Sequence, residues 1–282
     1  MYSKTIKSIY GGGGALTLHD NPRKESVQNA IKLFGSELRH EFPTAVGIEV
    51  EIEQATRFGS VDEAYWRTIP DTSLRNDGVE LVSAPLQQRQ IFEALANLQK
   101  FYEANPRSEF SHRCSIHVHV DVQKMTYEQL LVMIGFYLTA EGIFFDSFFP
   151  DRKGNNYCFP LTSVQLTQKD IQKRALRREV WKYAAVNLYH LTDFGTLEFR
   201  QHPGTKNIND LLAWIKTIHN IVTYAQRTPL KEFLTTLNEL NTTSGYTEYV
   251  RAVLPDWAHP IEPGNIYDSV TAAKYFLHQK GD

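Results

Sequence analysis

The stretch VGIEVEIE, residues 46–53, decides how the rest of the chain is interpreted. Successive side chains of a β-strand point to opposite faces, so its apolar residues share one face and its three glutamates share the other. Carboxylates two apart on a strand lie roughly 6.5–7 Å from each other. They repel by about 0.6 kcal/mol in water, but by about 2.5 kcal/mol at an effective dielectric constant of about 20. The glutamate face therefore destabilises the fold little if it is solvated and strongly if it is enclosed.

Three other segments repeat this design of an apolar back and a polar front: CSIHVHVDV at 114–122, GTLEFRQ at 195–201 and GVELVS at 78–83. Solvated strand faces more often carry Lys, Thr, Ser and Gln, and none of these strands has a front-facing Lys. A face of carboxylates and imidazoles lacks compensating charge, which divalent cations would supply. Oxygen-rich ligation with one imidazole suits Mg²⁺ or Mn²⁺ better than zinc. The front-facing residues are Glu49, Glu51, Glu53, Glu80, Ser115, His117, His119, Asp121, Thr196, Glu198 and Arg200.

Arg200 is the cation of this set. If the carboxylates bind metal ions, the guanidinium of Arg200 would point toward those ions. A second positive charge there would favour binding of an anion such as a phosphate. The alternative is a plain ion pair between Glu198 and Arg200.

Composition bounds the class of protein. The chain has 282 residues, of which 42% are hydrophobic and 22% charged, as in ordinary globular proteins. A net charge of −2 gives no basic surface for general nucleic-acid binding. Two cysteines cannot form a disulfide framework or a Cys-rich zinc site, and the N-terminus has no signal-peptide pattern. We expect a cytoplasmic protein.

Apolar spacing predicts helices at 26–40, 87–104, 126–149, 167–182 and 207–227, and two strands joined by a turn within 186–204. The apolar run 130–149 contains Glu141 and Asp146, which are costly in a bilayer, so it predicts a buried helix and no membrane span. The run Gly11–Gly14 lacks the ending of a P-loop and predicts a flexible turn or leader. We expect an α+β fold with a largely antiparallel sheet, and an N-terminal segment 1–40 before a domain 41–282.

The motifs GxExE, D-x-S…G-x-E-L-V-S, HVHV and Y…VNL…GTLEFRQHPGT occur in this order over residues 44–225. Together they resemble the amidoligase family often encoded by phages, in the superfamily of glutamine synthetase and glutamate–cysteine ligase. The resemblance implies a curved antiparallel sheet of glutamine-synthetase type with helices on its apolar face. It also implies transfer of the γ-phosphoryl group of ATP to a carboxylate, followed by attack of an amine on the acyl phosphate.

Carried over by motif, the resemblance implies that Mg²⁺ or Mn²⁺ is held by Glu49, Glu51, Glu80, His117 and Glu198. His119 would contact ATP phosphates, and Arg200 would clamp the transferring phosphoryl group. Asp71 would hold or deprotonate the amine, with Ser73 and Arg75 near the substrate. Arg152 would fold over the nucleotide and Asn187 would line the site.

Local roles as caps, turns or surface residues remain open for Asp71, Ser73, Arg75, Arg152 and Asn187. Glu53 lies outside GxExE and is expected to mark the solvent edge, while His190 and His202 are expected to be structural or surface residues. Two other functions also stay open: a metal-dependent hydrolase, suggested by His-x-His on a strand, and a non-catalytic binding or structural protein. The substrates would be small-molecule or peptide acids and amines, with nucleic acid involved only as a modified base.

Overall fold

A computed structural model describes residues 24–55, 61–164, 166–172, 176–256 and 263–278. The run Gly11–Gly14 lies outside these residues. The chain divides into two compact units, which are described separately below. The sheet unit contains the described parts of residues 14–121 and 198–216, and the helical unit contains the described parts of 122–197 and 217–282. The division expected after residue 40 stays a prediction.

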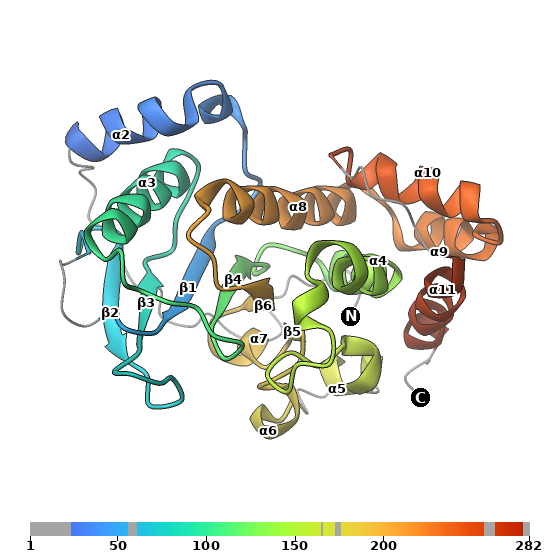
Figure 1. Ribbon diagram of the computed structural model, residues 1–282. Helices are drawn as coiled ribbons and strands as arrows, with labels where there is room; N and C mark the ends of the chain where they lie inside the picture. The colour runs from blue at the N-terminus through green and yellow to red at the C-terminus, as the bar shows by residue number, and fades with distance from the viewer. Residues whose placement is uncertain (1–23, 56–60, 165, 173–175, 257–262, 279–282) are drawn as a thin grey trace. The chain divides into compact units, whose positions relative to one another are not determined.

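The sheet unit is built on an open sheet with strand order β2-β3-β1-β4-β6 (Figure 1). β1 lies between β3 and β4 and pairs with both in antiparallel fashion. Its register places Glu51 opposite Glu80 on β3 and Glu49 opposite His117 on β4. The α+β class with an antiparallel sheet is therefore confirmed. The strands are β1 (Val46–Ile52), β2 (Trp66–Pro70), β3 (Val79–Ser83), β4 (Ser115–Asp121) and β6 (Thr196–Pro203).

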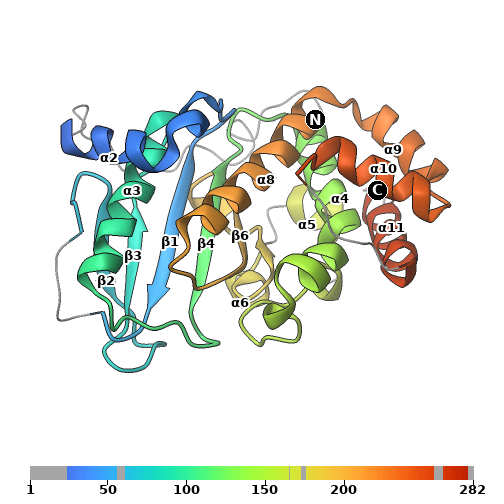
Figure 2. The ribbon, with the colours of Figure 1, turned by 45° about the horizontal axis from the view of Figure 1, so that its top comes forward.

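Helices cover the apolar back of this sheet, as the sequence predicts. Figures 1 and 2 show α3 (Arg89–Ala104) and the start of α8 (Ile208–Arg227) on the same face. The indole Nε1–H of Trp66 donates to the Ala94 carbonyl oxygen of α3 at 3.0 Å, and Phe199 of β6 packs edge-on against Trp214 of α8. The unit also contains α2 (Lys24–Phe34) and the 3-10 turn η1 (Gly35–Arg39).

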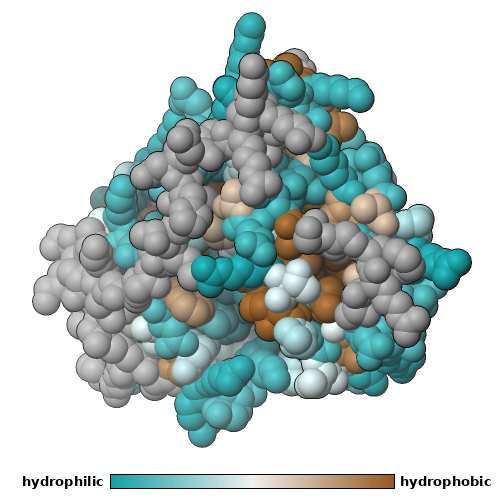
Figure 3. Space-filling model, turned by 90° about the vertical axis from the view of Figure 1, so that its left-hand side faces the viewer, coloured by the Kyte–Doolittle hydropathy of each residue, from teal (hydrophilic) through white to brown (hydrophobic). Residues whose placement is uncertain are grey.

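Strand β2 was not predicted, because its sequence WRTIP has no alternation of apolar and polar residues. It is the edge strand, and its residues after Trp66 are exposed. Pairing with β3, together with the burial of Trp66 at its first position, therefore makes this segment a strand. Figure 3, which views this side, shows a group of hydrophobic residues near its centre with hydrophilic ones around it.

The helical unit is built around α4 (Tyr127–Ile143), which begins at a capping box formed by Thr126 and Gln129. The apolar segment Tyr127–Phe148 is long enough to cross a membrane, but 83% of its most apolar window is buried inside the protein. The prediction of a buried helix is confirmed. The unit's other elements are η2 (Phe144–Phe148), η3 (Pro150–Arg152), η4 (Leu161–Val164), α5 (Gln168–Gln172), α6 (Arg178–Trp181), β5 (Val186–Asn187), α7 (His190–Asp193), the end of α8, α9 (Leu230–Glu239), α10 (Thr243–Val253) and α11 (Pro263–His278).

Two predictions in this unit were wrong in detail. The helix expected over 167–182 is replaced by the short helices α5 and α6. Leu176 and Arg177, which the structure describes, are not helical, so the predicted helix is interrupted. The first strand expected within 186–204 has only two residues and is followed by α7. There the Asn187 side-chain oxygen accepts the Tyr189 N–H at 2.9 Å, which turns the chain away from the strand.

Gly135 in the middle of α4 allows a close approach of helices within this unit. A Cβ atom at this position would lie 2.5 Å from Cε1 of Phe233 and 3.2 Å from Cδ1 of Leu277. Alanine improves helix propensity by about 1 kcal/mol, but overpacking a core costs roughly 1–3 kcal/mol. We therefore expect Gly135→Ala to lower the free energy of unfolding, measured by denaturant titration. Gly35→Ala, where a Cβ atom meets nothing within 4 Å, is the matched control; an equal loss in both variants would contradict this account.

Candidate functional site

Much of the front of the sheet is buried, while Glu49, Glu80 and Arg200 are half-buried. Relative exposure is 8% for Glu51, 2% for His117, 8% for His119 and 1% for Glu198. A solvated polar face is therefore excluded for these residues, and the charges must be balanced within the protein or by a ligand.

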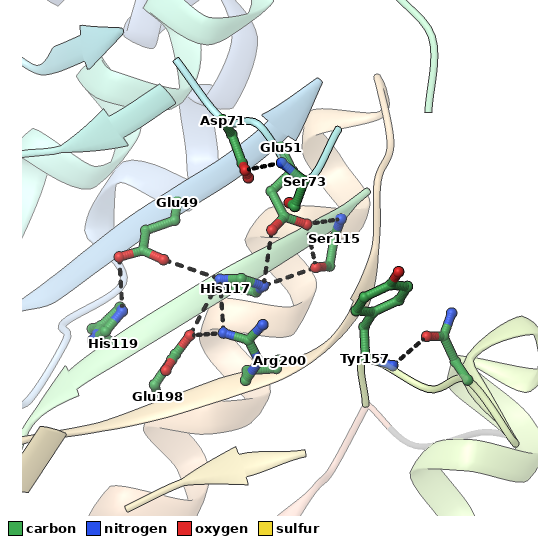
Figure 4. Close-up of polar contacts among 11 residues, drawn as sticks. Glu49, Glu51, Asp71, Ser73, Ser115, His117, His119, Tyr157, Glu198 and Arg200 are labelled. Carbon is green, nitrogen blue, oxygen red and sulfur yellow. Dashed lines mark hydrogen bonds and ion pairs between the residues drawn. The ribbon is translucent and has the colours of Figure 1, made fainter. Parts of the chain in front are cut away.

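His117 lies at the centre of this front (Figure 4). Its Nδ1 atom is 3.0 Å from Oε2 of Glu49 on β1 and 3.2 Å from Oε1 of Glu198 on β6. Its Nε2 atom is 3.9 Å from Oε1 of Glu51. One imidazole on β4 thus faces carboxylates from both neighbouring strands, because antiparallel pairing keeps opposed side chains on one face.

Ser115 connects two of these groups. Its backbone N–H and its hydroxyl lie 2.7 Å and 2.6 Å from the same Glu51 oxygen, Oε2. The hydroxyl oxygen also lies 2.8 Å from Nε2 of His117. The sequence placed Ser115 on the correct face but assigned it no role, since a serine in a strand carries no distinctive signal.

The outer members of the cluster pair with the carboxylates. Nε2 of His119 lies 3.1 Å from Oε1 of Glu49. Nη1 of Arg200 donates to Oε1 of Glu198 and lies 3.4 Å from Nδ1 of His117. The ion pair considered for Glu198 and Arg200 therefore exists, and Arg200 at the same time faces the shared front.

Burial and neighbouring charges set the protonation of the cluster. Burial raises the pKa of Glu49, but the contacts with His117 and His119 outweigh it and hold this pKa well below its ordinary value. For His119, burial is outweighed by Glu49, so the pKa of the imidazole is raised. Burial, followed by the charges of Glu49, Glu51 and Asp71, raises the pKa of Glu80 to about 9. The positive charges of the cluster therefore do not offset the burial of Glu80 and its repulsion by the neighbouring carboxylates.

Two groups of side chains in the sheet unit have ligand atoms within 4.8 Å of one another: Glu49, His117 and Glu198, and Glu51, Glu80 and His117. Two carboxylates at this distance repel by about 3.5 kcal/mol at an effective dielectric constant of about 20. A divalent cation removes this repulsion, and the donor set of several carboxylates with one imidazole suits Mg²⁺ or Mn²⁺. These residues therefore fit the metal ions that the sequence predicts.

Asp71, Ser73 and Arg75 belong to the hairpin loop between β2 and β3. Oδ1 of Asp71 accepts the Ser73 N–H at 2.8 Å, so Asp71 has the local turn role that the sequence left open. The charge of Asp71 also contributes to the raised pKa of Glu80, so Asp71 lies near the cluster. Ser73 and Arg75 are exposed, and their substrate contacts stay predictions.

The expectation that Glu53 marks the solvent edge was wrong. Glu53 is 3% exposed, and its Oε1 atom accepts the Arg75 backbone N–H at 2.9 Å and the Ser111 hydroxyl at 3.1 Å. Nη1 of Arg113 donates to the Ser73 carbonyl oxygen at 3.0 Å. Glu53 and Arg113 thus fix the hairpin loop that carries Asp71. These contacts join residues far apart in sequence, and no local pattern could have indicated them.

Arg152 and Asn187 belong to the helical unit, and both are buried. The contact of Asn187 with the Tyr189 N–H is a local turn contact. Their predicted nucleotide contacts remain predictions. His202 has the structural role expected, since it is buried and its Nδ1 lies 2.6 Å from the Pro203 carbonyl oxygen; the ring of His190 stacks on Phe194.

Glu80 provides a test of the charge imbalance. A carboxyl whose folded pKa is raised from 4.5 to about 9 contributes stability below pH 4.5, and this contribution is lost as the pH rises toward 9. We expect Glu80→Gln in EDTA to become progressively more stable than the unmodified chain between pH 5 and pH 9, measured as the difference in Tm. Added Mn²⁺ should raise the Tm of the unmodified chain at pH 8 more than that of the variant. A Tm difference independent of pH would contradict this assignment.

Comparisons with known proteins place the chain in a family. No curated protein matches the chain. A solved structure described as "Crystal structure of novel glutamine synthase homolog" is similar over 90% of this chain and 70% of that chain, with 10% identity and a TM-score of 0.35. A likeness of that size carries no argument about function. Residues 51–222, more than half of the chain and including all the front-facing residues of the cluster except Glu49, match the family described as "Putative amidoligase enzyme". The chain belongs to this amidoligase family.

Proposed function

We propose that the protein is an ATP- and Mg²⁺-dependent carboxylate–amine ligase. The bond between the γ-phosphorus of ATP and its bridging oxygen breaks as a substrate carboxylate oxygen binds that phosphorus, which gives ADP and an acyl phosphate. The nitrogen of an amine then attacks the acyl carbon, the bond from this carbon to the phosphate oxygen breaks, and the amine loses a proton. The products are an amide, ADP and phosphate.

One observation carries this proposal: carboxylates from β1, β3 and β6 meet two imidazoles of β4 and one guanidinium of β6 on a single, largely buried face. Phosphoryl transfer needs positioning and charge neutralisation more than covalent participation by the protein. Membership in the amidoligase family supports a ligase among the reactions that such a face could serve.

The residues that would hold divalent cations are Glu49, Glu51, Glu80, His117 and Glu198. When bound, Mg²⁺ would neutralise phosphate oxygens and polarise the transferring group. The glutamates bind and orient these ions, and the sheet keeps them at fixed separations because each is anchored in a paired strand.

Arg200 is proposed as the clamp on the transferring phosphoryl group and His119 as a contact to the phosphates. Burial opposes the charge of Arg200, but Glu198 and Glu51 outweigh it and raise its pKa further, so the guanidinium stays charged. A charged group fixed by Glu198 stabilises negative charge that grows on the phosphoryl oxygens, without reorganising during the reaction. Asp71, beside Glu80, is proposed to take the proton of the amine. Ser73 and Arg75 are proposed to contact the substrates, and Arg152 and Asn187 the nucleotide.

Replacing Glu198 by Gln tests the need for a carboxylate at this position. We expect Glu198→Gln to reduce ADP release, in a screen of carboxylate and amine pairs, by at least about a hundredfold with the fold intact by circular dichroism. Glu93→Gln is the matched control, because Glu93 is equally buried but bonds Tyr65 and Arg89 on the back of the sheet.

The alternatives give different outcomes in the same assay. Substrate turnover without nucleotide would identify a hydrolase. No binding of Mg·ATP at millimolar concentration, measured by isothermal titration calorimetry, would favour a non-catalytic binding protein. Equal activity of Glu198→Gln and the unmodified chain would contradict the proposed site.

Arg200 offers a second, more specific test. We expect Arg200→Ala to slow phosphoryl transfer in single-turnover experiments by about a hundredfold or more, while the Kd for Mg·ATP rises less than tenfold, because the guanidinium acts mainly on charge that develops in the transition state. Arg200→Lys keeps the charge but not the planar fork, so it should recover part of the rate. An equal loss of rate and of ATP affinity would mean that Arg200 only anchors the nucleotide.

A further inference from the structure

Ser115 is a buried hydroxyl between two groups of candidate metal ligands. It is 1% exposed, and it contacts one member of each group: Glu51 of the group with Glu80, and His117 of the group with Glu49 and Glu198. We propose that Ser115 is a positioning residue that fixes the His117 ring as the Nε2–H form, so that His117 offers Nδ1 to a divalent cation shared with Glu49 and Glu198 and offers nothing to the Glu51 and Glu80 side. This inference rests on the metal-binding part of the proposed function.

The argument begins with the donors around Glu51. The backbone N–H of Ser115 can only donate, and it points at Oε2 of Glu51 at 2.7 Å. This oxygen is therefore an acceptor, and the Ser115 hydroxyl at 2.6 Å donates to it as well. A serine hydroxyl has one proton, so after this donation its oxygen can only accept.

The consequence for His117 follows directly. Its Nε2 lies 2.8 Å from a hydroxyl oxygen that has no second proton to give. Nε2 must therefore carry a hydrogen and donate it to Ser115. A ring nitrogen that carries a hydrogen cannot bind a metal ion, and so the only lone pair that the ring can offer is that of Nδ1.

Geometry places that lone pair usefully. Nδ1 faces Oε2 of Glu49 at 3.0 Å and Oε1 of Glu198 at 3.2 Å. The opposite ring edge, which bears Nε2, is held by Ser115 at 2.8 Å. Of the two groups that proximity alone would allow for His117, the hydrogen bonds select the one with Glu49 and Glu198.

Ser115 also orients Glu51. Both of its donors reach the same carboxylate oxygen, Oε2, and Oε1 lies 3.9 Å from Nε2 of His117, beyond hydrogen-bond distance. Ser115 thus holds Glu51 by Oε2, and Glu51 belongs to the ligand group with Glu80. Removal of one hydroxyl should therefore weaken both groups, which a purely local packing role would not do.

Metal binding is the first test. We expect Ser115→Ala to weaken Mn²⁺ binding about tenfold or more, measured by electron paramagnetic resonance of free Mn²⁺ without nucleotide, as is typical when a partner of a metal ligand is removed. Ser115→Thr keeps the hydroxyl and should restore most of the affinity. Ser83→Ala is the matched control, because Ser83 is a buried serine of β3 whose hydroxyl bonds Ile48 N–H and the Ala84 carbonyl, away from the ligand groups.

The form of the His117 ring is the second test, and it does not depend on turnover. In ¹⁵N NMR spectra of the unmodified chain, with His117→Gln used for assignment, we expect Nε2 to carry a hydrogen with and without Mg²⁺, and the Nδ1 resonance to shift on Mg²⁺ binding. In Ser115→Ala the two ring forms should become mixed. An Nδ1–H form in the Mg²⁺-loaded chain, or Mn²⁺ affinity of Ser115→Ala within twofold of the unmodified chain, overturns the inference.

These outcomes separate this inference from the ligase proposal. Tight Mn²⁺ binding with the expected ring form but no ADP release with any substrate would overturn the ligase and leave the role of Ser115 standing. ADP release with an Nδ1–H ring would do the reverse. Absence of Mn²⁺ binding to the unmodified chain would overturn both the role of Ser115 and the metal dependence of the proposed reaction.

Discussion

The burial of several like charges on one face of a sheet is the constraint on which the rest of the structure depends. Four glutamates from three strands would repel strongly in an enclosed space, and the side chains of His117, His119 and Arg200 offset only part of that repulsion. The raised pKa of Glu80 marks the part that stays uncompensated. A face with this imbalance lowers the stability of the fold, and bound divalent cations would offset it.

The antiparallel register satisfies this constraint by ordering the charges. β4 lies between β1 and β6, so its two histidines separate the carboxylates of the flanking strands. Gly47 lies opposite His119 on β4. A Cβ atom added at Gly47 would lie 3.5 Å from the Cβ atom of His119, which is ordinary van der Waals contact. The apolar back, packed on α3 and the start of α8, holds these strands in place. Sheet pairing thus positions the functional side chains, and hydrophobic packing supports the pairing.

A second layer of contacts makes the cluster specific. Ser115 fixes one edge of His117 and one oxygen of Glu51, while Glu53 and Arg113 fix the hairpin loop that carries Asp71. Apart from Ser115 and His117, which are two positions apart, these contacts join residues 22 to 64 positions apart in the chain. The role of each of these polar atoms depends on the group to which it is hydrogen-bonded.

The sequence by itself determined the strands β1, β3, β4 and β6, their two faces, the buried helix α4 and the set of glutamates, histidines and Arg200, because strand alternation and helix spacing are local properties of neighbouring residues. It did not reveal β2, the break between α5 and α6, or the short β5, where pairing and side-chain turns decide the outcome. Only the tertiary structure decided that much of the polar front is buried, that Glu53 is a buried support and that Ser115 joins two ligand groups. The physical reason is that burial and hydrogen-bond partners depend on which strands lie side by side, and the alternation within one strand contains no information about its neighbours.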